Sequence, residues 1–119
     1  MTMWPSKWTK TAEELVKLLE HWDGAKGEVW EYSANQCQML IRFFRERPNS
    51  HQSLFLLCRE CRTVHFQTYW LDMQVKVSLK TDGQPRFYTV TDGDRLRIEC
   101  AEVLAAESDM LIRLPDKAR

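Results

Sequence analysis

Residues 53–70 constrain the fold more strongly than any other stretch of the chain. Their sequence, SLFLLCRECRTVHFQTYW, holds an apolar run, the pair Cys58 and Cys61, and a run rich in β-branched and aromatic residues. Both runs are typical of strands, and the polar dipeptide between the cysteines is typical of a turn. The pattern predicts two strands that fold back on each other at the Cys-x-x-Cys pair, with the rest of the chain packed on this hairpin.

One amphipathic helix is predicted at residues 11–22. Thr11 and Glu14 fit a capping box, in which the hydroxyl and the carboxylate each bind a free backbone amide at the helix start. Gly24 follows the segment, and glycine readily ends a helix in a left-handed conformation. Apolar residues recur at spacings of three and four, which aligns them on one side of the helix. These residues are Leu15, Leu18, Leu19 and Trp22.

Most of the remaining chain follows the two-residue period of strands. The predicted strands lie at residues 28–34, 37–44, 72–80, 86–91 and 110–114, whereas residues 100–106 suit a strand or a short helix. Large apolar groups on both faces of residues 37–44 indicate a central strand. A two-residue turn at Asp92 and Gly93 is predicted to place Arg95 and Arg97 on the same strand face as Tyr88.

Together these elements predict an α+β fold for a single domain that spans residues 1–119. Six to eight strands would form a twisted antiparallel sheet, curled toward a half-barrel, with the helix at residues 11–22 packed on one face. A chain of 119 residues buries about two thirds of its unfolded surface. Its stability therefore requires neither a disulfide nor a metal.

Charge and hydropathy narrow the classes of partner. The chain has 17 basic and 17 acidic residues, and this balance argues against nucleic acid or an anionic membrane as its main partner. No apolar run approaches the ~20 residues of a membrane span, and the first residues lack the pattern of a signal peptide. We therefore expect a cytoplasmic protein whose four cysteines are thiols.

The pair Cys58 and Cys61 raises the hypothesis of a zinc site. On a tight turn two thiolates supply half of a tetrahedral site, and His65 would share a strand face with Cys61 as a third ligand. Cys37 or Cys100 would complete the set. The chain lacks a second close ligand pair and has Arg62, not glycine, after the second cysteine. This favours cysteines that act as small apolar residues, so no cofactor is predicted and zinc is the alternative.

Aromatic and arginine residues are abundant for a domain with one helix. Tryptophan, tyrosine and arginine are the usual hot-spot residues of protein interfaces. The same residue types can stack on single-stranded nucleic acid, but the interleaved Glu46, Glu60 and Glu99 favour a solvated mixed-charge face. The candidate interface residues are Trp30, Arg42, Phe44, Tyr69, Trp70, Tyr88, Arg95 and Arg97.

The sequence contains no nucleophile elbow, no glycine-rich phosphate loop and no His-Glu-x-x-His motif, so no catalytic residue is nominated. The predicted function is a non-catalytic protein-interaction module that binds a protein partner, as an inhibitor or immunity protein does, or a second copy of itself. One alternative is a small zinc- or nucleic-acid-binding domain centred on the Cys58-x-x-Cys61 hairpin. Another is a small-molecule binder or enzyme with a cavity between sheet and helix.

Overall fold

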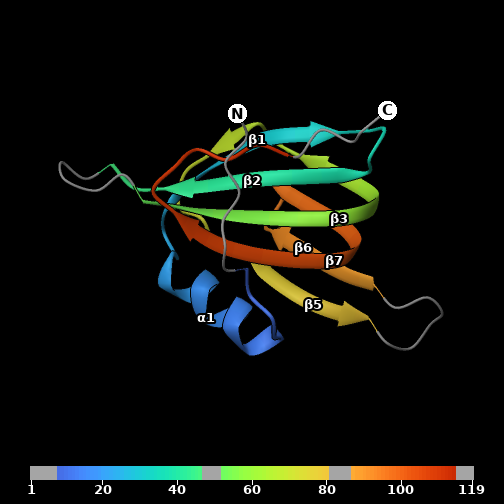
Figure 1. Ribbon diagram of the computed structural model, residues 1–119, viewed down its shortest axis with the longest axis horizontal. Coiled ribbons are helices and arrows are strands. Elements are labelled where there is room, and N and C mark those ends of the chain that lie inside the picture. The colour runs from blue at the N-terminus through green and yellow to red at the C-terminus, as the bar shows by residue number, and fades with distance from the viewer. Residues whose placement is uncertain (1–7, 47–51, 81–86, 115–119) are drawn as a thin grey trace.

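The computed structural model describes residues 8–46, 52–80 and 87–114. In these ranges one helix packs on seven antiparallel strands that form a curled sheet, a half-barrel, in the order β4-β1-β2-β3-β7-β6-β5 (Figure 1). The α+β prediction is thus confirmed. The elements are α1 Ala12–His21, β1 Lys26–Ser33, β2 Gln38–Phe44, β3 Ser53–Phe66, β4 Tyr69–Trp70, β5 Lys76–Lys80, β6 Phe87–Asp92 and β7 Leu96–Ser108.

Helix α1 begins as its sequence predicts. The hydroxyl of Thr11 accepts from the backbone N–H of Glu14 at 3.2 Å, and the Glu14 carboxylate accepts from the N–H of Lys10 at 3.0 Å. Satisfying these amides stabilises the first turn. Two residues after the C-cap, Gly24 takes a φ of +87°, which only glycine adopts without strain. The helix then lies under the open side of the curl (Figure 1).

The sheet carries an apolar cluster on each face. The inner cluster joins α1 to alternate residues of the central strands, such as Ile41 and Leu56. The outer cluster contains Leu40 and Phe55, so β2 is covered on both faces as predicted for a central strand. The predicted strand at residues 110–114 is wrong, because this segment pairs with none of the strands that the structure describes. Its Ile112 packs on the outer cluster instead.

The hairpin predicted at the cysteine pair is wrong. Residues on both sides of the pair belong to β3, which runs through 14 residues without reversing. A register shift between Cys61 and Thr63, together with a φ of +54° at Glu60, marks a bulge in the strand. A bulge bends a strand and disrupts its hydrogen-bond ladder only locally. The partner that holds the ladder is β7, so residues 100–106 are strand and not helix.

The turn between β6 and β7 forms at the predicted place with a different length. Asp92 pairs with Leu96, which leaves a loop of residues 93–95 where two loop residues were predicted. Because side chains alternate along a strand, the extra residue turns Arg97 to the outer face, and Tyr88 packs on the inner cluster. The prediction that Arg97 shares a face with Tyr88 is therefore wrong.

The carboxylate of Asp92 closes one side of the half-barrel. Trp70 on β4 donates its indole N–H to Asp92 Oδ2 at 2.8 Å, and the backbone N–H of Gln74 donates to the same oxygen at 3.1 Å. Arg95 donates to Asp92 Oδ1 at 2.6 Å. Asp92 is only 1% exposed, and these three hydrogen-bond donors satisfy its buried carboxylate. The hydrogen bond between Trp70 and Asp92 thereby joins β4, at one end of the strand order, to β6 near the other end.

Candidate functional site

Three candidate interface residues stack on one another on the outer face of the sheet. The Arg42 guanidinium lies 4.4 Å from the ring centroid of Phe44 and 5.5 Å from that of Trp30. Arg42 also pairs with Glu28 at 2.9 Å, and Trp30 donates its indole N–H to the carbonyl of Ile112 at 2.6 Å. The Arg42 guanidinium and the Trp30 indole N–H therefore both have partners within the domain.

Of the other five candidates, only Tyr69 lies near this stack, in register with Arg42 through Glu28 on the strand between them. Trp70 is buried, Tyr88 packs on the inner cluster, and Arg95 donates to backbone carbonyls of the segment that follows β4. Tyr69 on β4 and Arg97 on β7 are exposed, but three strands separate β4 from β7 in the sheet. The structure does not gather the eight candidates on one face.

Of the three candidate metal ligands, Cys58 and Cys61 lie on the inner face, where both thiols interact with the Cys100 thiol, whereas His65 lies apart from them. Cys61 packs beside Val64 and Phe66 on the inner cluster, so His65, which alternates with them, points to the opposite face. A hydrogen bond with the Cys100 thiol, together with burial, raises the pKa of the Cys61 thiol. Among the described residues, no three histidine, cysteine or acidic side chains come together to hold a metal ion.

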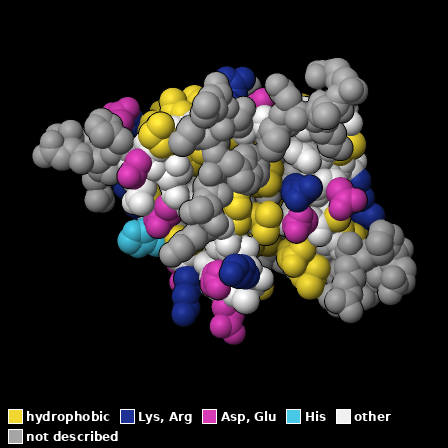
Figure 2. Space-filling model, in the orientation of Figure 1, with side chains coloured by type: hydrophobic (Ala, Val, Ile, Leu, Met, Phe, Trp, Pro, Cys, Tyr) yellow, Lys and Arg dark blue, Asp and Glu magenta, His cyan; other side chains and the backbone are white. Residues whose placement is uncertain are grey.

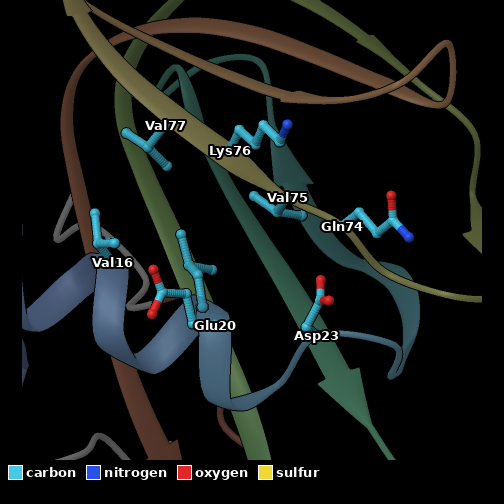
Figure 3. Close-up of a pocket in the computed structure, with 8 residues that line it drawn as sticks. Val16, Glu20, Asp23, Gln74, Val75, Lys76 and Val77 are labelled. Atoms are coloured by element: carbon cyan, nitrogen blue, oxygen red, sulfur yellow. The ribbon is translucent and has the colours of Figure 1, made fainter.

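A different feature stands out as a candidate site, namely a groove of about 600 Å³ between α1 and β5. Figure 3 shows the helix as one wall and β5 as the other, with the two elements running in opposite directions. Valine and leucine side chains form most of the floor, and two carboxylates lie on the helix side. The lining residues are Val16, Leu19, Glu20, Asp23, Gln74, Val75, Lys76 and Val77.

The periodicities of the two elements build this groove. Val16, Glu20 and Asp23 are spaced by four and three residues, so they form a stripe beside the buried stripe of α1. Along the other wall, Val75 and Val77 turn inward, and Figure 3 shows the Lys76 ammonium pointing away from the helix. Val16 remains 43% exposed, which leaves room above it for another side chain.

The groove lies beside an edge of the sheet. β5 is the last strand in the order and pairs only with β6 among the strands that the structure describes. Its outer backbone N–H and C=O groups are therefore open to another strand. Figure 2 shows apolar side chains at the lower right of the visible face, in the region of β5. The other edge strand, β4, has only two residues.

The sequence left open a cavity between sheet and helix but did not place one between α1 and β5. The predicted strand at residues 72–80 was not identified as an edge strand. Lysine at both ends of β5 is a common feature of sheet edges, and Val16 is an apolar residue outside the buried stripe of the helix. These two signals together could have pointed to the site.

Comparisons of the chain with models of protein families, with curated proteins and with solved structures find no match. In the part of the chain that the structure describes, no helix is long and apolar enough to cross a membrane.

Proposed function

We propose that this chain is a non-catalytic protein-interaction module that binds an extended segment of a partner protein alongside β5. The observation that carries the proposal is the groove between α1 and the open edge of β5. A strand edge supplies backbone hydrogen bonds, and an adjacent groove accepts every second side chain of the added strand. The two features supply affinity and selectivity in one place.

The dimensions of the groove suit a short segment. β5 has five residues and α1 has ten, which correspond to lengths of about 17 Å and about 15 Å. An extended segment of about five residues would match both walls. Exposed apolar groups at the two walls, Val16 at 43% and Leu79 at 44%, would be covered by such a segment.

The sequence of β5 favours a different protein over a second copy of this chain. β5 begins and ends with lysine. Pairing of two β5 strands would bring four lysines together, and like charges across a strand pair are unfavourable. Lysines on an edge strand therefore act against self-association and still permit pairing with a partner of other composition.

The proposal is tested by selecting linear peptides from a random seven-residue display library on the purified protein. Hydrogen exchange of the β5 amides is then measured by NMR with and without a selected peptide. We expect the outward-facing amides of β5 to exchange about tenfold more slowly when the peptide is bound, because strand addition gives them acceptors.

A matched pair of variants locates the binding. Val16→Glu places a charge in the groove and should abolish binding, whereas Met110→Glu changes a similarly exposed apolar residue elsewhere and should leave it intact. Thermal melts confirm that both variants fold. The proposal is overturned if no linear peptide binds, if bound peptides leave β5 exchange unchanged, or if the protein dimerises with its β5 amides already protected.

A further inference from the structure

Two acidic side chains, those of Glu20 and Asp23, lie on the helix side of the groove. No described residue forms an ion pair or a side-chain hydrogen bond with the carboxylate of Glu20 or Asp23. Arg45, which lies nearby, donates to the backbone carbonyls of His21 and Asp23 at 3.0 Å and 2.9 Å. The carboxylates thus remain available to a positive charge from outside.

Their position is also unfavourable for the helix itself. Glu20 lies in the last turn of α1, and Asp23 follows the C-cap residue Trp22. Negative charge at a helix C-terminus opposes the helix dipole. The two acids therefore do not contribute to helix stability through the dipole, and their place on the wall of a groove gives them a different use.

We infer that the bound segment has the pattern apolar-x-apolar-x-basic and runs antiparallel to β5, an inference that rests on the function proposed above. Every strand pair in the sheet is antiparallel, and this pairing is slightly more stable per residue than parallel pairing. An antiparallel segment would start opposite Leu79, continue opposite Val77 and end opposite Val75.

The spacing of residues along α1 determines which position of the bound segment carries the positive charge. Glu20 lies roughly 6 Å beyond Val16 along the helix axis, and Asp23 follows two residues after the helix end at His21. The groove-facing residues of an extended segment are about 7 Å apart. A side chain above Val16 and Val77 is therefore followed, two residues later, by one between the two carboxylates. Figure 3 places Val16 below Val77 and Asp23 below Val75, as this alignment requires.

Three synthetic peptides test the pattern. The first is acetyl-Gly-Val-Thr-Val-Thr-Lys-Gly-amide, the second replaces lysine by glutamate, and the third reverses the residue order of the first. We expect the first peptide to bind about tenfold more tightly than the second in 50 mM salt, because one charge changes from attracted to repelled by two carboxylates. This ratio should shrink in 0.5 M salt. The reversed peptide should bind less tightly than the first, because its lysine would lie opposite Leu79, away from the two carboxylates.

The double variant Glu20→Gln/Asp23→Asn should bind the lysine and glutamate peptides within about twofold of each other. The control Glu13→Gln/Asp109→Asn removes two exposed carboxylates outside the groove and should keep the tenfold preference. Equal binding of the first two peptides to the wild-type protein, with β5 amides protected, overturns the charge pattern and leaves the proposed function standing. Equal binding of the reversed peptide overturns the direction.

If none of the three peptides binds, while peptides selected from the library protect the β5 amides, the pattern is wrong and the function is retained. If the library peptides also fail to protect β5, both proposals are overturned. The two proposals therefore fail separately, because β5 protection reports strand addition and the peptide ratio reports the charge.

Discussion

Replacing Asp92 by alanine should destabilise the protein more than any other single change in the turn between β6 and β7. The change leaves the buried Trp70 indole N–H and the part-buried Gln74 amide without their acceptor. It also removes the carboxylate that faces Arg95. An unsatisfied buried donor costs about 1–3 kcal/mol, and Arg95, which is partly exposed, adds about 1 kcal/mol or less.

The expected loss of unfolding free energy is therefore about 3 kcal/mol. At roughly 2.1 cal/mol/K of unfolding entropy per residue, a chain of 119 residues has about 0.25 kcal/mol/K. Asp92→Ala should thus lower the Tm by about 12 °C. Asp92→Asn keeps an oxygen acceptor and loses the charge, so its Tm should fall by about 4 °C.

Circular dichroism melts at pH 7 measure both shifts, and Asp94→Ala is the matched control because Asp94 is exposed in the same turn. The control should change the Tm by less than about 2 °C. The reasoning is refuted if Asp92→Ala melts within 3 °C of the wild type, or if asparagine is as damaging as alanine.

Three further predictions follow from the packing around Gly27 and from the burial of the thiols. Gly27→Ala should lower the unfolding free energy in urea by about 1–3 kcal/mol, because its Cβ would lie 2.8 Å from a ring atom of Trp70; an unchanged midpoint would contradict this. With iodoacetamide at pH 7.5, only the exposed Cys37 should be alkylated rapidly, and mass spectrometry of the digest would reveal early labelling of Cys61 or Cys100, whose pKa values are raised. For the same reason these two thiols keep their protons in the folded state at pH values where the unfolded chain loses them, so their contribution to stability is constant below about pH 8.5 and falls above it. Melts from pH 7 to pH 10 should show a steeper decline for the wild type than for Cys61→Ala/Cys100→Ala.

Local signals in the sequence were sufficient for α1 and β2. Thr11 and Glu14 fix the helix start through contacts within four residues, and the apolar residues on both faces of β2 report its central position directly. Long-range pairing decided the rest. Whether the chain reverses at Cys58 and Cys61 depends on β7, which lies about 40 residues further along and holds both ends of β3 in one ladder.

The aromatic candidates show the same limit. The excess of tryptophan predicted an interface, because a domain with one helix was expected to have too small a core for all of these rings. Trp22 donates to Glu107 and Trp30 to Ile112, across separations of 85 and 82 residues. A buried tryptophan needs one acceptor, and only the fold shows where that acceptor lies. The sequence left open a cavity between sheet and helix but could not place it, since the walls of the groove come from elements that are distant in the sequence.

The two edges of the sheet are treated differently, and this difference bears on binding. At one edge, β4 has two residues, and its Trp70 is held by Asp92, so it offers little backbone to a partner. At the other edge, β5 is fixed on one side by five residue pairs with β6 and is open on the other. A strand that is held in place before binding loses little conformational entropy when a segment is added. Asp92 lies on β6, the strand that pairs with β5. The hydrogen bonds of Asp92 therefore hold in place the strand on which the open edge of β5 depends.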